Sequence, residues 1–194
     1  FMRIYLASQS PRRQELLQQI QVTFDLLLPD ASEDTESVEA ILPNERPLAY
    51  VKRVVRAKAQ LALQRLHKRQ LPVRPILVAD TTVALARQIF GKPASPAEHK
   101  QMLQALSGKT HRVITGVALV TAGQMSETVS ISQVTFAALS PNQIQRYIDS
   151  HEGQDKAGGY AIQGVAAAFI THISGSYSGI VGLPLAETAQ LLQL

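Results

Sequence analysis

The pattern of apolar and polar positions along the chain predicts five strands. β-branched residues and an alternating period mark the segments 3–8, 74–80, 111–120, 127–139 and 167–174. Helical patterns lie between several of these strands. Strands interleaved with helices indicate an α/β fold, in which functional groups are expected in the loops at the strand ends.

Three helices are predicted to begin in the same way, at a serine followed by a proline. The pairs are residues 10–11, 95–96 and 140–141. The serine side chain can accept a hydrogen bond from the first free N–H groups, and the proline fits the first helical position. Ser95 and Glu98 also predict a capping box.

The segment 29–47, PDASEDTESVEAILPNERP, is acidic and lacks a clear period. We predict a long loop there. Loops of this length in compact domains are usually either disordered or functional.

Length and composition allow one medium domain or two small lobes that share a cleft. The chain has 194 residues, of which 45% are hydrophobic, and this is enough for a core. It contains no cysteine, which excludes disulfides, thiolate metal sites and a cysteine nucleophile. The apolar runs are too short for a membrane span, and the first residues lack the apolar region of a signal peptide. We therefore expect a cytoplasmic protein with no membrane partner.

The charge balance favours a small anionic ligand over a nucleic acid. The net charge is +4, and the positive residues are spread along the chain. Only 5% of the residues are aromatic and none is tryptophan, so the chain offers neither a basic stripe nor a stacking platform for nucleic acid. A phosphorylated small molecule needs only a few local cations.

Two groups of cations are candidates for binding such a ligand. Arg12 and Arg13 fall in the first turn of a predicted helix, where N–H groups favour an anion, and the alternative is a solvated pair. Lys58 falls within an apolar helical stripe that includes Val54 and Val55. A buried ammonium group is costly without a partner, so we expect Lys58 to reach a phosphate or a carboxylate. The alternative is a stem that reaches solvent from the edge of the stripe.

An acid at the end of a predicted strand is a further candidate. The apolar segment 74–80 ends in Asp80, and Thr81 follows it. Carboxylates at this place serve as general bases or metal ligands in such folds, and the alternative is a cap on the strand end. Two other motifs are rejected. GKT at 108–110 lacks the first glycine of a phosphate-binding loop, and GSYSG has tyrosine where a hydrolase needs serine.

Seven motifs follow one another in order over almost the whole chain. They are ASQSPRR, KA at 58–59, ADTTV, GKP, LSGKTHRVITG, DKAGGYAIQG and GSYSGIVGLPL. Together they strongly resemble the Maf family of nucleoside triphosphate pyrophosphatases, and the forms ADT and YAIQG are similar to the branch that hydrolyses dTTP and UTP rather than the branch acting on 7-methyl-GTP. The resemblance implies a single domain over residues 2–194. Its fold would be mixed α/β, with an elongated central sheet flanked by helices and two lobes around a cleft, as in ITPase-like proteins.

The resemblance also implies a reaction and a set of roles. The family cleaves a nucleoside triphosphate between the α and β phosphates with a divalent cation, magnesium or manganese, and releases the monophosphate and pyrophosphate. By motif match Asp80 accepts the proton of the attacking water, while Arg12, Thr81 and Gln163 govern base choice. Polar or cationic positions around the triphosphate are matched by Ser8, Arg13, Lys58, Lys92 and Lys156.

The metal and the biological role are less closely specified by the resemblance. Glu33 falls near a family acid that helps to hold the metal together with Asp80, and Asp34 or Glu36 could take its place. A homodimer is implied. The family is also associated with arrest of septum formation, so a regulatory protein that acts by binding is the alternative function. The presence of every matched catalytic position favours the enzyme.

The segment 153–164, GQDKAGGYAIQG, contains four glycines. We expect Gly158 and Gly159 to let backbone N–H groups approach the phosphates beside Lys156, and Gly164 to keep the approach to the base open. Gln163 carries both an amide donor and an acceptor, so it can complement a uracil or thymine ring.

Overall fold

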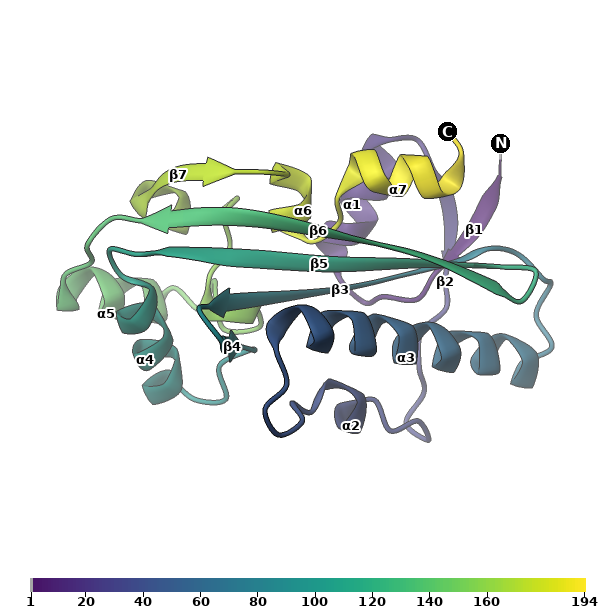
Figure 1. The fold of residues 1–194 in the computed structure, drawn as a ribbon, viewed down its shortest axis with the longest axis horizontal. Coiled ribbons are helices and arrows are strands. Elements are labelled where there is room, and N and C mark those ends of the chain that lie inside the picture. The colour runs from purple at the N-terminus through teal and green to yellow at the C-terminus, as the bar shows by residue number, and fades with distance from the viewer. Residues whose placement is uncertain (1) are drawn as a thin grey trace.

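The computed structural model describes residues 2–194 and contains one seven-stranded mixed sheet (Figure 1). Its strands run in the order β2-β1-β3-β5-β6-β7, and β4 pairs with β3. β1 is parallel to β2 and to β3, and the other pairs are antiparallel. The strand bounds are β1 Arg3–Leu6, β2 Thr23–Leu26, β3 Ile76–Leu85, β4 Gln88–Phe90, β5 Thr110–Thr121, β6 Gln124–Phe136 and β7 Ile170–Ser174.

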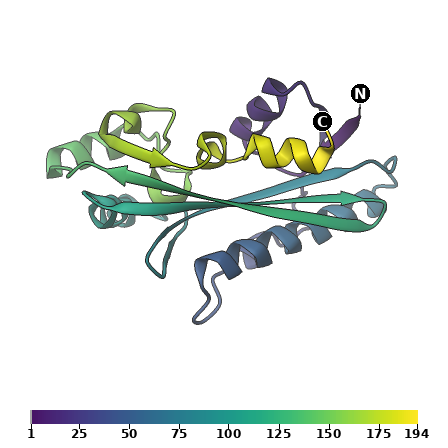
Figure 2. The same cartoon turned by 45° about the horizontal axis from the view of Figure 1, so that its top comes forward.

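Helices flank this sheet on both faces. Figure 2 shows α3 along one face, with α1 and α7 on the opposite face of the same half. The helix bounds are α1 Pro11–Gln19, α2 Glu36–Glu39, α3 Pro47–Lys68, α4 Pro96–Leu106, α5 Pro141–Asp149, α6 Tyr177–Val181 and α7 Leu185–Leu192, with 3-10 turns η1 Ala157–Gly159 and η2 Val165–Phe169. The predicted mixed α/β fold with an elongated, helix-flanked sheet is confirmed. Within residues 2–194 no helix combines the length and apolarity that a membrane span requires.

The three serine caps are where the sequence predicts them. Ser10, Ser95 and Ser140 each accept a backbone N–H three residues later. The capping-box prediction at Ser95 is only half right, because the Glu98 side chain accepts from Ala94 N, at 3.1 Å, instead of from Ser95 N. The reciprocal box occurs at Ser140, whose N–H is accepted by the side chain of the residue at the third helical position.

Alternation along β3 fills two cores on opposite faces of the sheet. Leu77 and Ala79 pack in a cluster with residues of α1, β1 and the C-terminal segment, whereas Ile76 and Val78 pack against α3. Because both faces of this part of β3 are covered, its sequence is continuously apolar.

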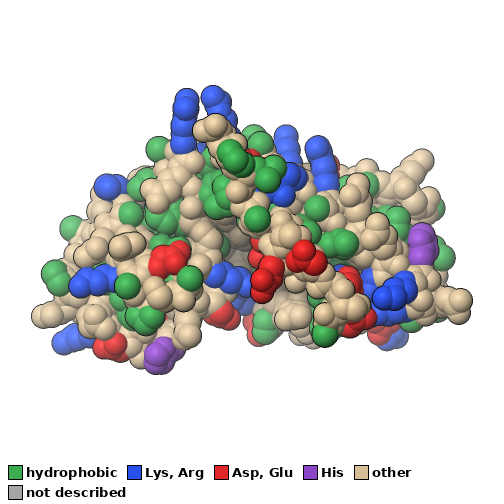
Figure 3. Space-filling model, turned by 90° about the horizontal axis from the view of Figure 1, so that it is seen from below, with side chains coloured by type: hydrophobic (Ala, Val, Ile, Leu, Met, Phe, Trp, Pro, Cys, Tyr) green, Lys and Arg blue, Asp and Glu red, His purple; other side chains and the backbone are tan. Residues whose placement is uncertain are grey.

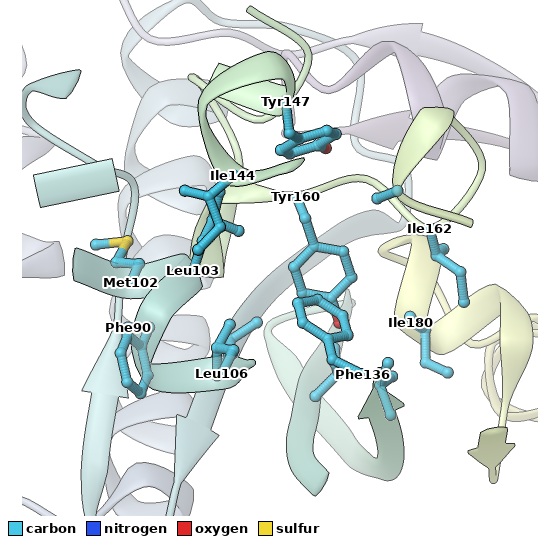
Figure 4. Packing of buried hydrophobic residues seen from close by; sticks show 14 of the residues in the cluster. Phe90, Met102, Leu103, Leu106, Phe136, Ile144, Tyr147, Tyr160, Ile162 and Ile180 are labelled. Carbon is cyan, nitrogen blue, oxygen red and sulfur yellow. The ribbon is translucent and has the colours of Figure 1, made fainter. Parts of the chain in front are cut away.

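A third core lies at the other end of the sheet, between β5, β6, α4 and α5 (Figure 4). Phe136 and Tyr160 meet there edge to face, with ring centroids 4.8 Å apart. Tyr160 belongs to the glycine-rich segment 153–164, so this core anchors that segment.

The structure extends several predicted elements and adds others. β3 continues to Leu85 and β6 begins at Gln124, beyond the predicted ends. β2 and β4 were not predicted, because segments of four and three residues are too short to show a period. The predicted loop 29–47 contains the one-turn helix α2 and the first turn of α3.

Candidate active site

A cleft of about 520 Å³ opens where β3 meets α1, α3 and the segment 153–164. Figure 3 shows a hollow near the middle of one face, with acidic and basic side chains at its edge. The structure brings almost the whole predicted site to this cleft, including residues far apart in sequence. The predicted residues that line it are Ser8, Arg12, Arg13, Lys58, Asp80, Thr81, Lys92, Lys156 and Gln163.

The alternation of β3 explains how two neighbouring residues take different partners. Asp80 continues the α3-facing set of positions, and its carboxylate contacts Lys58 on α3. Thr81 continues the α1-facing set, and its hydroxyl accepts from Arg13 on α1 at 3.1 Å. Two consecutive residues of β3 therefore contact α3 and α1, which lie on opposite faces of the sheet, and both residues line the same cleft.

Lys58 Nζ lies between two carboxylates. It is 2.7 Å from Asp80 Oδ1 and 2.6 Å from Glu39 Oε1. Asp80 is only 8% exposed, so this cation compensates a largely buried charge. Burial opposes ionisation of Glu39, but the charge of Lys58 and its hydrogen bond hold the pKa of Glu39 below its ordinary value. The prediction that Lys58 reaches a carboxylate is confirmed, and the alternative of a stem running to solvent is not.

Arg13 is held by protein groups on three sides. Its Nε donates to Gly182 O at 2.8 Å, and its terminal nitrogens donate to Ser8 Oγ at 3.2 Å and to Thr81 Oγ1. Burial lowers the pKa of Arg13. The side chain is therefore not one of a solvated pair, and it ties the N-terminal loop, β3 and the C-terminal segment together. Arg12 donates to Val181 O at 3.3 Å from the same helix turn.

These residues of α1, α3 and β3, with Ser8 and Glu39, form what we call the sheet wall of the cleft. The segment 153–164 forms the opposite side, which we call the loop wall. On the loop wall Gln163 is exposed, and Lys156 Nζ lies 2.9 Å from the exposed carboxylate of Asp155.

The glycines of the loop wall have a different purpose from the one predicted. An added Cβ would lie 2.8 Å from the Val83 side chain at Gly158 and 2.6 Å from the His99 ring at Gly159. Both glycines also have positive φ angles, of 72° and 75°. Their N–H groups donate to Gly91 O and Lys156 O. The predicted role in phosphate binding is therefore wrong, because these glycines make room for protein contacts and their N–H groups are already bonded.

Gly164 is also constrained by the protein itself. A Cβ there would lie 1.9 Å from Glu152 Oε1. The Glu152 carboxylate accepts from Val165 N at 2.8 Å and Ala166 N at 3.3 Å. The glycine thus lets a carboxylate cap the next turn, and the predicted role of keeping the approach to the base open is not supported.

Two buried histidines hold the loop wall from behind. His99 Nε2 lies 2.6 Å from Gly159 O, and His111 Nε2 lies 2.6 Å from the Tyr160 hydroxyl. Burial lowers the pKa of His111 to about 4, so the ring is neutral at physiological pH. Tyr147 OH accepts from Ala161 N at 3.0 Å and fixes the next residue.

Glu33, the predicted metal ligand, is not among the residues that line the cleft. Its carboxylate pairs with the Arg65 guanidinium, at 2.8 Å from Nη2. Asp34, one alternative, accepts from Ser37 N. Glu36, the other, does line the cleft, as does Glu39. Glu39 was missed because the segment 29–47 contains six acids and nothing in the sequence distinguishes them.

Contacts with α3 position Glu39. Tyr50 OH donates to Glu39 O at 2.9 Å, and Arg53 donates to Val38 O at 3.1 Å and to Ala40 O at 2.7 Å. Burial, with the charges of Asp80 and Glu39, raises the pKa of Tyr50 to about 12, so its hydroxyl remains a donor at neutral pH.

The two carboxylates beside Lys58 are suited to a divalent cation that also binds phosphate oxygens. Asp80 and Glu39 already converge on a single positive charge, the Lys58 ammonium group. Within residues 2–194 no group of three or more acidic, histidine or cysteine side chains is placed to hold a metal. Magnesium is commonly held by one or two carboxylates plus substrate phosphates and water. The donor set here matches that arrangement.

Comparisons with known proteins find similar proteins over almost the whole chain. A family model described as "Maf-like protein" matches residues 3–194. The chain is 60% identical to a protein named dTTP/UTP pyrophosphatase from Albidiferax ferrireducens, over 98% of this chain and 95% of that protein. It is 58% identical to a protein of the same name from Ralstonia nicotianae, over 97% and 92%. A HAM1 protein structure from Coxiella burnetii is similar in fold, with a TM-score of 0.52, 19% identity and coverage of 100% and 99% of the two chains.

Proposed function

We propose that this chain, which belongs to the Maf family, is a nucleotide pyrophosphatase that hydrolyses dTTP and UTP to the monophosphate and pyrophosphate. The observation that carries the proposal is a largely buried carboxylate, Asp80, held by Lys58 in a cleft that Arg12, Lys92 and Lys156 also line. The similar proteins from two bacteria bear the name of this activity, which favours an enzyme over a regulator of septum formation that acts only by binding.

The cations of the cleft are suited to a triphosphate. Phosphoryl transfer depends on positioning and on neutralising charge spread over the phosphate oxygens. Arg12, Lys92 and Lys156 line the cleft from α1, the β4–α4 connection and the loop wall, so they can surround a polyphosphate from several sides. A magnesium or manganese ion, held by Asp80 and Glu39, would supply further neutralisation of phosphate charge when bound.

In this proposal Asp80 accepts the proton of the attacking water. Lys58 bonds to its Oδ1, which fixes the carboxylate and leaves Oδ2 to accept a proton. In the proposed step the water oxygen forms a bond to the α-phosphorus and the bond to the α–β bridging oxygen breaks. Pyrophosphate then leaves and the water proton passes to Asp80. The fixed hydrogen bond lets the base keep its orientation during the step.

Pyrophosphate release tests this proposal directly. The purified full chain is assayed with dTTP, UTP, CTP, ATP and GTP, each with magnesium, with manganese or with a chelator. We expect one molecule of pyrophosphate for each monophosphate from dTTP and UTP, and loss of turnover with the chelator. Release of single orthophosphates, or no turnover of dTTP and UTP, would overturn the proposal. The homodimer that the resemblance implies and the cytoplasmic location expected from the sequence are proposed with it, and light scattering of the purified chain measures its oligomeric state.

A further inference from the structure

A chain of hydrogen bonds runs from the cleft into the sheet. β3 and β5 pair Thr81 with Thr115 directly across the two strands. Their Oγ1 atoms are 2.9 Å apart, and Thr115 Oγ1 lies 2.8 Å from Gly179 O. At the other end Arg13 Nη2 donates to Thr81 Oγ1 at 3.1 Å.

Only one order of protons satisfies this chain. A carbonyl oxygen can only accept, so Thr115 gives its one hydroxyl proton to Gly179 O. Thr115 must then accept the proton of Thr81. A guanidinium group can only donate, so Thr81 also accepts from Arg13. The Thr81 hydroxyl therefore uses its proton and one of its two lone pairs within the protein. Only the second lone pair is left to bind a ligand, so Thr81 can act toward a ligand only as an acceptor.

The surroundings hold this order in place. Thr115 is 1% exposed, so water does not compete for its hydroxyl. Gly179 lies in the short helix α6, near the end where carbonyl groups lack partners within the helix. Thr81 is partly exposed and lines the cleft, so its remaining lone pair is available to a ligand there.

Gln163 cannot provide the same discrimination. Its carboxamide can rotate by half a turn and exchange donor and acceptor. It can therefore donate to O4 of uracil or accept from the N4 amine of cytosine. Discrimination between uracil and cytosine requires a group that cannot exchange its donor and acceptor roles.

We propose that Thr115 is a positioning residue that keeps Thr81 a pure hydrogen-bond acceptor and so selects pyrimidines with a protonated N3, uracil and thymine, over cytosine. The inference rests on the proposed function. Thr81 receives the N3–H of uracil or thymine, whereas the N3 lone pair of cytosine meets the Thr81 lone pair. A site that leaves polar groups unpaired against the wrong substrate rejects it.

The test is the ratio of kcat/KM for UTP to that for CTP in the full chain. T115V keeps the shape but removes the acceptor for the Thr81 proton, which can then turn toward cytosine. We expect the ratio to fall about tenfold, chiefly because CTP improves. T115S keeps a hydroxyl and should keep the ratio. The matched control is T110V, because Thr110 on the same strand bonds to Thr135 across exposed strands, with 2.7 Å between their Oγ1 atoms, and should leave the ratio unchanged.

The outcomes separate the two proposals. If the wild-type chain does not turn over UTP or dTTP, the proposed function fails. If it prefers UTP to CTP and folded T115V keeps that preference in full, only the role of Thr115 is overturned. If circular dichroism shows T115V unfolded, T81A decides instead. Removal of the acceptor should lower the ratio about tenfold by weakening UTP, and an unchanged ratio would overturn the inference.

Discussion

The sheet wall and the loop wall of the cleft hold their polar groups in different ways. On the sheet wall, Lys58 bonds to Asp80 and Glu39, and Arg13 bonds to three protein groups. On the loop wall, Lys156 pairs with an exposed neighbour and Gln163 faces solvent. The charged groups of the sheet wall lose their water when the protein folds, so their geometry is fixed before a ligand binds.

This difference assigns different tasks to the two walls. Bond making and breaking need groups held within a fraction of an ångström, and a network between packed elements can supply this. Recognition of the base by an amide does not need a fixed side chain. A side chain that can rotate is able to align its amide with the base. The sheet wall should therefore couple activity to stability, whereas changes on the loop wall should leave stability unaffected.

The largest loss of activity is expected for Asp80→Asn. The amide keeps the shape but cannot accept the water proton or help to hold a metal ion, so kcat should fall about a thousandfold. Binding of the triphosphate should change little, because the cations remain. The matched control is Asp25→Asn, since Asp25 pairs with Arg3 on the surface and does not line the cleft. Turnover near the wild-type rate in Asp80→Asn would remove Asp80 from the catalytic step.

Two lysines, one on each wall, compare the walls directly. Lys58→Met and Lys156→Met should each reduce kcat/KM for dTTP by about a hundredfold through lost charge stabilisation. Lys58→Met also leaves the buried Asp80 carboxylate without its cation, which should cost about 2 kcal/mol of folding free energy. That corresponds to a fall in Tm of roughly 4–8 °C. Lys156→Met should keep the wild-type Tm, because its partner Asp155 has a side chain that is 77% exposed.

Calorimetry of the double variant Lys58→Met/Asp80→Asn sharpens this comparison. Removing the stranded charge should restore part of the lost Tm. Equal Tm values for the two lysine variants would show that the walls do not differ in the way described.

Two acids of the segment 29–47 separate metal binding from structure. Glu39→Gln should reduce activity about tenfold to a hundredfold and raise the magnesium concentration needed for half-maximal rate. Glu33→Gln should leave kcat near the wild-type value and lower the Tm instead, because Arg65 loses its carboxylate partner. A magnesium titration of both variants decides which acid serves the metal. A raised magnesium requirement in Glu33→Gln, with none in Glu39→Gln, would return the metal to Glu33.

The stability effect of Glu33 has a defined pH dependence. Hydrogen bonds from Arg65 lower the pKa of Glu33 from its ordinary value of 4.5. A carboxyl group with a lowered folded pKa stabilises the protein fully above its unfolded pKa, and this contribution is lost as the pH falls through the folded value. The difference in Tm between wild type and Glu33→Gln should therefore be constant from pH 6 to 8 and shrink below about pH 4.5.

The sheet wall could largely be predicted from the sequence. A lysine in an apolar helical stripe and an acid after an apolar run are each costly alone, and the structure pairs them. The predicted strand end at Asp80 is wrong, because β3 continues to Leu85. The serine caps were predicted because their signal is local. Thr115 is recognisable in the sequence as a polar residue in an apolar strand. Its role, however, depends on the strand register that places it opposite Thr81.

The loop wall and the acidic segment could not be predicted in the same way. Glycine is required at 158, 159 and 164 because a Cβ there would clash with Val83, His99 and Glu152, respectively. Tertiary packing alone brings these side chains to the glycines. That Glu39 rather than Glu33 lines the cleft depends on Tyr50 and Arg65, which fix the path of the segment from α3. A glycine or an acid in the sequence indicates that its position is constrained. The residue that it contacts is known only from the tertiary structure.

The smallest effect is expected on the loop wall itself, at Gln163. Gln163→Leu removes the amide that can bond to the edge of a pyrimidine, so kcat/KM for dTTP and UTP should fall about tenfold while purine triphosphates change little. The Tm should stay at the wild-type value, because the side chain is exposed and leaves no buried partner unpaired. A matched control is Gln154→Leu, an exposed glutamine of the same segment that does not line the cleft. The measurement is kcat/KM for dTTP, UTP, CTP, ATP and GTP in the three proteins. Since Thr81 keeps its fixed lone pair in this variant, the discrimination of UTP from CTP should survive even as pyrimidines lose their advantage over purines. A variant that keeps the full pyrimidine preference would move base recognition away from Gln163 and leave it to the sheet wall alone.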